Sequence, residues 1–226
     1  MNSFPDWLWV VVLALGCVLL IGARLYGARS RKRAFEMAAV PLGLTNAGTR
    51  NDLRTERKKF NLLSRGHSGR WTNLHSDLSG SCLMFDFSYT FGLPFVASKR
   101  YRQTVAAFST RSVDLPDFQL TPATVLDRAA PALGFKAIKN DLRPEFGKRY
   151  WLRGPDEFRV GAVFTEVRID ELKALDPGGH YSIEKGGNWL IVYRHGTLAG
   201  DRYLVPFWHS AQRIAGLFLG TPKALL

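Results

Sequence analysis

The feature that most constrains this chain is an uninterrupted apolar run from Trp7 to Tyr26, followed at once by an arginine-rich segment. Twenty residues of α-helix extend about 30 Å, which is the thickness of the hydrocarbon core of a bilayer. We therefore expect residues 1–27 to form a single transmembrane anchor and the lipid bilayer to be a partner of the protein.

Two other interpretations of the N-terminus are open. A cleavable signal peptide needs a positively charged leader, and the leader here contains Asp6 and no Lys or Arg. A lipoprotein signal at Cys17 needs small residues before the cysteine and a polar chain after it, whereas Leu15 precedes it and the run stays apolar beyond it. The pattern favours a retained anchor.

The flanks of the run predict its orientation, because Lys and Arg close to a spanning helix stay on the cytoplasmic side. All the nearby bases follow the run, so we expect the N-terminus outside the inner membrane and the C-terminal domain in the cytoplasm. Two cysteines, one of them within the run, provide no disulfide framework, and we expect Cys82 to be a small buried residue. The residues predicted to lie at the membrane interface are Trp7, Trp9, Arg24, Tyr26, Arg31, Lys32 and Arg33.

The rest of the chain has the hydrophobic content of a folded domain, since 46% of the whole sequence is hydrophobic. Residues 28–59 predict a basic juxtamembrane helix over 31–42, ended by Pro41 and Gly43, and then a polar loop. Residues 60–226 predict one cytoplasmic α+β domain of antiparallel strands and helices.

A period of two marks the clearest strand of this domain. Leu83, Phe85, Phe87 and Tyr89 share one face, and Met84, Asp86, Ser88 and Thr90 share the other. We expect residues 70–76 and 102–109 to be its antiparallel neighbours. The polar row would then face solvent, with Asp86 and Ser88 paired across the strand with Arg102 and Thr104.

Further elements follow from capping and turn residues. Thr121-Pro122 predicts an N-cap and first turn of a helix that ends at Gly134, after an extended edge segment over 115–118. Helices are expected over 156–164, 165–175 and 202–219, and strands over 150–152, 180–184 and 188–195. The likeness of residues 38–44 to residues 129–135 allows a duplicated helix-plus-sheet unit, although shared helix-stop chemistry also explains it.

Several segments together resemble a family of uncharacterised bacterial single-pass membrane-anchored proteins. They are Phe85–Thr90, Gln103–Ala106, Leu115–Phe118, Pro144–Phe146 and Arg153–Glu157, and the likeness covers most of the soluble region. The resemblance implies a membrane-anchored module and carries no catalytic residue, cofactor or ligand to this chain.

The net charge of +12 suggests anionic surroundings. The bases cluster at two places, Arg54, Arg57, Lys58 and Lys59, and Lys99, Arg100 and Arg102. Anionic headgroups are one candidate partner, while nucleic acid is disfavoured because no RNA-binding aromatic signature or recognition helix accompanies the bases. No histidine spacing, phosphate loop or nucleophile motif predicts a metal, cofactor or reaction.

The sequence therefore favours a non-catalytic binding or scaffolding module at the cytoplasmic membrane surface, with an unidentified protein partner. One alternative is a membrane-tethered enzyme whose ligand face is Asp86, Ser88 and Arg102. The other is association with anionic lipid or nucleic acid through the basic clusters.

Overall fold

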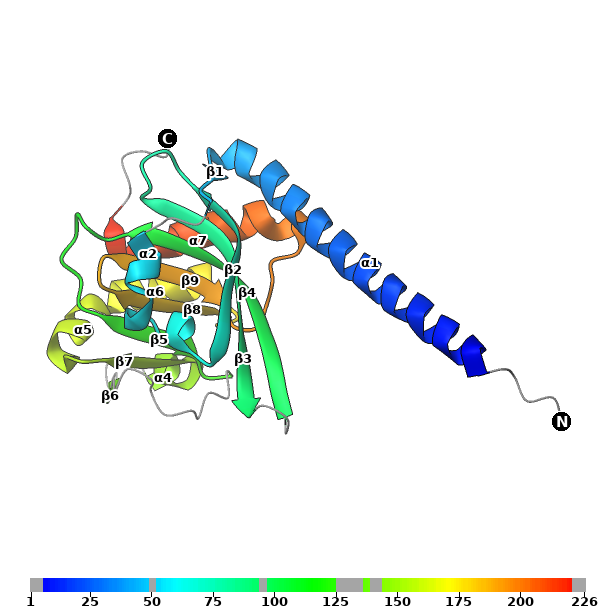
Figure 1. Cartoon of the computed structure of the whole chain (residues 1–226). Coiled ribbons are helices and arrows are strands. Elements are labelled where there is room, and N and C mark those ends of the chain that lie inside the picture. Colours follow the sequence, from blue (N-terminus) through cyan, green and yellow to red (C-terminus); the bar gives the residue numbers. More distant parts are fainter. Residues whose placement is uncertain (1–5, 49–51, 94–96, 125–135, 139–143, 221–226) are drawn as a thin grey trace.

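The computed structural model describes residues 6–48, 52–93, 97–124, 136–138 and 144–220. Its first element is a long helix, α1 (Asp6–Ala39), which projects from the rest of the molecule (Figure 1). The helix passes through Gly27 without a break, so the separate juxtamembrane helix expected from residue 31 is its continuation. It ends in the 3-10 turn η1 (Val40–Leu42), where Pro41 and the left-handed Gly43, with φ of 65°, stop it as predicted.

The body of the domain is one nine-stranded sheet in the order β1-β2-β3-β4-β9-β8-β5-β7-β6, antiparallel throughout. This confirms the predicted α+β fold. The strands are β1 (Thr45–Asn46), β2 (His67–Ser76), β3 (Cys82–Leu93), β4 (Ala97–Ser109), β5 (Phe118–Pro122), β6 (Lys136–Ile138), β7 (Tyr150–Gly154), β8 (Tyr181–Gly186) and β9 (Trp189–Arg194).

The central hairpin has the register that the sequence predicted. Strand β3 pairs with β2 and β4, and Asp86 lies opposite Thr104 while Ser88 lies opposite Arg102. The hairpin β8–β9 also forms, and β9 pairs with β4 to join the two parts of the sheet. The hairpin pairings β2–β3 and β8–β9 follow from strand residues bounded by a glycine-containing turn, whereas β4 and β9 pair although they lie far apart in the sequence.

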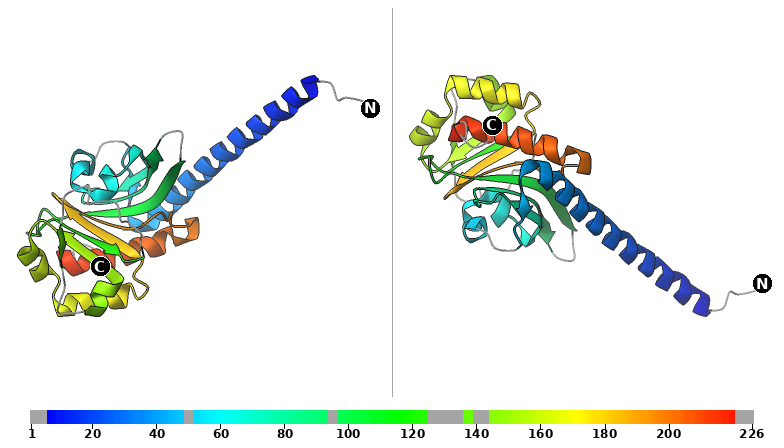
Figure 2. Two further views of the ribbon diagram at one scale, coloured as in Figure 1. Left: turned by 90° about the horizontal axis from the view of Figure 1, so that it is seen from below. Right: turned by 90° about the horizontal axis from the view of Figure 1, so that it is seen from above.

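Helices cover both faces of the sheet (Figure 2). One face carries the short helices α2 (Asp52–Thr55) and α3 (Asn61–Ser64), joined by the 3-10 turn η2 (Arg57–Lys59). The other face carries the end of α1 together with α4 (Pro144–Arg149), α5 (Glu157–Val163), α6 (Glu166–Leu175), the 3-10 turn η3 (Asp201–Tyr203) and α7 (Leu204–Leu219).

Two apolar cores result, one on each face. Beneath α2 and α3, the predicted β3 row of Leu83, Phe85, Phe87 and Tyr89 is buried together with Phe60. Beneath the larger helical layer, the apolar face of α7, which includes Trp208, Ile214 and Phe218, is buried with the end of α1 and with Met84 from β3. Both faces of β3 are therefore covered along part of its length.

The helices expected to begin at residues 156 and 165 both form, and each begins with a side-chain cap. The Asp156 side chain accepts a hydrogen bond from the Arg159 amide at 3.0 Å, and Thr165 accepts one from the Arg168 amide. Both cap residues have extended backbone, which is the conformation that an N-cap adopts.

Two local predictions are wrong. Thr121 and Pro122 lie in β5, an inner strand, and do not begin a helix, because Phe118 and Leu120 of the same segment fill the core and pair with β7 and β8. The segment 46–59, expected to be a loop, contains α2 and η2, since Leu53 is fully buried. The helix predicted after Pro122 and the second copy of the proposed repeat lie outside the described residues, so the duplication stays a prediction.

Candidate functional site

The anchor helix is attached to the sheet through its last two turns. Ala34, Phe35 and Ala38 are buried, and together with Arg31 they form the i, i+3, i+4, i+7 face of a helix. The Phe35 ring is fully buried and stacks on His75 at 5.8 Å between ring centroids. Burial of a phenylalanine side chain contributes about 1.5–3 kcal/mol, so this face holds α1 against the domain.

Arg31 uses all five of its N–H groups in this attachment. Its Nε and Nη2 donate to the two oxygens of Asp86 at 2.9 and 3.0 Å, and Nη2 also donates to the Thr104 hydroxyl at 3.0 Å. Its Nη1 donates to the Ala199 carbonyl at 2.5 Å and to Asp201 at 2.9 Å. The guanidinium also lies 4.8 Å from the Phe35 ring centroid. A guanidinium has five donors, so this one has none left for another ligand.

Asp86 is correspondingly enclosed. Besides the two bonds from Arg31, its carboxylate accepts the Thr104 hydroxyl at 2.8 Å and the Asn73 side-chain amide at 3.1 Å. The residue is 3% exposed, and Ser88 is 8% exposed. The prediction that Asp86 and Ser88 face solvent is therefore wrong, because Arg31 at the end of α1 covers Asp86 and Arg100 lies against Ser88.

Asn73 reaches Asp86 because the backbone of β2 is irregular there. Its φ is 54°, and the register between β2 and β3 shifts between Thr72 and His75. Asn is among the few residues that tolerate this left-handed conformation, and such a bulge redirects a side chain. A strand irregularity thus completes the set of donors around the carboxylate.

Next to this ion pair lies a basic hollow of about 250 Å³ between α1, β2, β3 and β4. We call it the anchor pocket. Its floor is Asp86 and Ser88, and the loop residue Leu198 also lines it. The basic side chains that line it are Arg31, Lys32, Arg70, Arg100 and Arg102.

The structure brings together the three residues of the predicted ligand face, since Asp86, Ser88 and Arg102 all line the anchor pocket. It also adds Arg31 and Lys32, which the sequence placed at the membrane interface. The other predicted interface residues lie on exposed parts of α1: Trp7, Trp9, Arg24, Tyr26 and Arg33.

Comparisons with known proteins give one informative result. No family model matches the chain, and no curated protein matches it. Its fold is that of the mycobacterial trehalose monomycolate transport factor A, TtfA. That crystal structure superposes with a TM-score of 0.56 at 15% identity, over 86% of this chain and 96% of the other. At this identity the likeness shows the fold alone.

The apolar run was predicted to form a helix, and this is confirmed. It lies within one helix that is long and apolar enough to cross a membrane. No part of its most apolar window is buried against the domain. With the large apolar side chains of this segment exposed, such as Leu13 and Leu19, a membrane location fits the structure.

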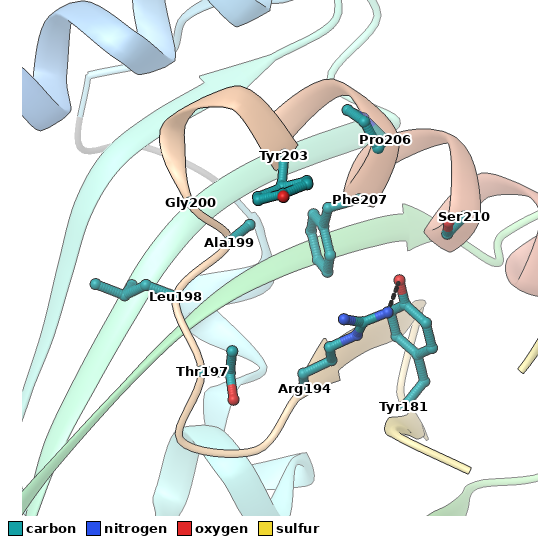
Figure 3. A pocket seen from close by; sticks show the side chains of 10 residues that line it. All are labelled: Tyr181, Arg194, Thr197, Leu198, Ala199, Gly200, Tyr203, Pro206, Phe207 and Ser210. Carbon is teal, nitrogen blue, oxygen red and sulfur yellow. Dashed lines mark hydrogen bonds between the residues drawn. The ribbon is translucent and has the colours of Figure 1, made fainter. Parts of the chain in front are cut away.

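A second hollow, of about 230 Å³, lies between the 197–200 loop, the ends of β8 and β9 and the start of α7 (Figure 3). Arg194 donates to the Tyr181 hydroxyl at 3.1 Å, and its guanidinium lies 4.5 Å from the Tyr181 ring centroid. Tyr203 and Phe207 approach from the side of α7 (Figure 3). This hollow is lined by one base and three aromatic side chains, and it is less charged than the anchor pocket.

Two titratable groups outside the anchor pocket, Glu184 and Cys82, are held within the packed part of the domain. Burial raises the pKa of Glu184, although hydrogen bonds from the Tyr193 hydroxyl at 2.6 Å and the Leu62 amide favour its ionised form. Burial also raises the pKa of Cys82 to about 12, so this half-buried thiol is a poor nucleophile. Within the described part of the chain, His, Cys, Asp and Glu side chains do not gather in groups that could hold a metal ion.

Sequence reasoning missed Arg31, Arg70 and Asn73 as members of this site. The strand register, once assumed, would have placed Arg70 opposite Ser88. The Arg31 contact had no local signal, because 55 residues separate it from Asp86.

Proposed function

We propose that this protein is a single-pass, non-catalytic binding or scaffolding module held at the cytoplasmic surface of the inner membrane. The observation that supports this proposal best is the continuity of α1. Its N-terminal part exposes large apolar side chains, such as Leu13, Leu19 and Ile21, and its last two turns are packed on the sheet without a linker between the two parts.

This continuity limits where the domain can be. Arg31 follows Tyr26 by five residues, which is about 8 Å along a helix. The sheet therefore lies directly beneath the headgroups if the apolar run spans the bilayer, and a partner protein would meet it there. The fold neighbour is named a transport factor. By this likeness, an accessory role in transport at a membrane is the form of scaffolding that we favour.

The arrangement gives less support to an enzyme. The carboxylate of Asp86 already accepts four hydrogen bonds, two of them from a guanidinium, so it is not available as a base. No other described group in the anchor pocket is a nucleophile with an adjacent base, since Ser88 accepts its hydrogen bond from Arg100.

The proposal is tested with the full chain carrying a reporter after Leu226 that is active only in the cytoplasm. We expect an active reporter and a protein that stays in the membrane pellet after an alkaline carbonate wash. A soluble protein, or one that lacks its first two dozen residues, would overturn the proposal.

A charge-swapped variant makes the orientation test specific. Asn2→Lys and Ser3→Lys combined with Arg29→Gln and Arg33→Gln move two positive charges to the other end of the span and leave Arg24, Arg31 and Lys32 in place. Arg29 and Arg33 are exposed, so the domain should fold unchanged. We expect the reporter activity to fall below that of the unmodified protein, because the difference in Lys and Arg between the two flanks determines which end stays inside.

A further inference from the structure

Three arginines surround one buried hydroxyl in the anchor pocket. Arg70 on β2 and Arg102 on β4 lie directly opposite Ser88 on either side, so all three side chains point to the same face of the sheet. Arg100, two residues before Arg102, donates to the Ser88 hydroxyl at 3.0 Å. Neighbouring strands are about 4.8 Å apart, which puts the backbones of Arg70 and Arg102 about 10 Å from each other.

This placement is unfavourable without an anion. The pocket contains five bases and one carboxylate, and that carboxylate is neutralised by Arg31. Arg70 and Arg102 lie on either side of β3, and their like charges repel across about 10 Å. For Arg70 and Arg102, the described residues provide no ion pair that would offset the repulsion.

With the apolar run spanning the bilayer as proposed, the pocket also lies at the depth of lipid phosphates. Ala28, Arg31 and Lys32 form its α1 wall, and they follow Tyr26 by two to six residues. At about 1.5 Å per residue they lie about 3–9 Å beyond the end of the apolar run, within the polar layer of a leaflet. Its volume of about 250 Å³ is smaller than a typical drug-sized site and suits a headgroup.

We propose that the anchor pocket binds the phosphate of an anionic phospholipid from the leaflet that surrounds α1. Arg70, Arg100 and Arg102 supply the charge-assisted donors, with Lys32 at the rim. Arg31 serves only as the wall, because its donors are saturated. The inference rests on the proposed membrane anchoring, since only an embedded α1 brings the pocket to the headgroups.

The test measures binding of short-chain phosphatidylglycerol and phosphatidylcholine to the full chain in a neutral detergent, by native mass spectrometry. We expect phosphatidylglycerol to bind at least about tenfold more tightly, because one charge-assisted contact is worth about 1.5 kcal/mol or more. The variant Arg70→Gln/Arg102→Gln should lose this preference. The control Arg57→Gln/Lys58→Gln removes the same amount of charge from the exposed turn η2, on the opposite face of the sheet. This control should keep the preference for phosphatidylglycerol.

Each other outcome has a definite meaning. Equal binding of the two lipids, or an equal loss in the control, would show that the pocket has no specific role and would overturn the inference. Inorganic phosphate that binds as tightly as phosphatidylglycerol would assign the pocket to a free anion instead. An oligonucleotide that binds more tightly than either would assign it to nucleic acid.

Folding and anchoring are monitored separately. Arg70 and Arg102 are exposed and repel each other, so their replacement should leave the thermal unfolding temperature unchanged or raised. Should the double variant not fold, Arg102→Gln alone must still weaken phosphatidylglycerol. Resistance to the carbonate wash depends on α1. An unmodified protein that resists the wash but shows no preference for phosphatidylglycerol would therefore contradict this inference and leave the proposed function standing.

Discussion

Arg31 and Asp86 are the two residues on which the position of the anchor depends. Their side chains are 11% and 5% exposed, so removal of one leaves the other charged and shielded from water. We predict that Asp86→Ala lowers the free energy of unfolding by about 3–5 kcal/mol, the range for one lost partner of a buried pair. Denaturant unfolding of the full chain in detergent measures it.

Asp201 provides the matched control for this prediction. Its carboxylate also bonds Arg31 at 2.9 Å, but its side chain is 54% exposed. Asp201→Ala should therefore cost less than about 1 kcal/mol. Equal losses for the two aspartates would mean that burial does not distinguish them. Faster amide exchange in residues 31–39 of the Asp86→Ala protein would show that α1 has loosened.

Glu184 predicts a dependence of stability on pH. Because burial raises its pKa in the folded protein above the ordinary value, the folded state holds the proton over a range where the unfolded state has released it. This contribution to stability is complete below the unfolded pKa and is lost as the pH rises through the folded pKa. Glu184→Gln should remove that decline, measured as the difference in unfolding free energy between the two proteins from about pH 4 to about pH 8. If the unfolding free energies of the two proteins changed in parallel with pH, Glu184 would not be the source of this pH dependence.

The turn before β2 depends on a glycine that no other residue can replace. Gly66 has φ of 62°, and a Cβ there would overlap the carbonyl oxygen of Thr90 in β3. We predict that Gly66→Ala destabilises the protein by about 2–4 kcal/mol, through the strained backbone and the clash together. Gly43, with φ of 65° and open space around it, isolates the backbone component, and Gly43→Ala should cost about 1 kcal/mol. The unfolding temperature measures both effects. If Gly66→Ala and Gly43→Ala lowered it equally, the contact of the new Cβ with Thr90 would add nothing to the loss.

The strands and caps that depend on local chemistry could be predicted from the sequence. The alternation over β3, the glycine turn between β8 and β9 and the caps Asp156 and Thr165 each act within a few residues. Thr121-Pro122 carries an equally good local signal, yet it lies in β5. Its neighbours Phe118 and Leu120 gain more from a place between β7 and β8 than a helix cap would provide.

The site shows the same limit more sharply. Alternation correctly put Asp86 and Ser88 on one face and the register correctly put them beside Thr104 and Arg102. A period of two cannot tell whether another element covers that face. The covering element is α1, whose course past Gly27 depends on packing of Phe35 against a sheet formed much later in the chain.

Anchor and domain form one connected body. A continuous helix resists bending, and the buried face of Phe35 with the Arg31 ion pair prevents its end from turning on the sheet. The orientation of the anchor pocket relative to the bilayer is then determined by the helix. A flexible tether would let the same domain present any face to the membrane. The continuous helix instead keeps the anchor pocket on the side of the domain that faces the anchor.

This coupling can be measured as a distance distribution. Spin labels at Leu20→Cys in the span and Ser112→Cys in the domain, both exposed, are introduced with Cys17 and Cys82 replaced by serine. We predict a narrow distribution for the native helix and a broad one after insertion of four Gly/Ser residues between Gly27 and Ala28. Four alanines at the same place should keep it narrow and move it by a few ångströms, because they lengthen the helix by about 6 Å without breaking it. A native distribution as broad as that of the Gly/Ser variant would mean that the domain swings freely, and the pocket would then have no defined depth in the headgroup layer.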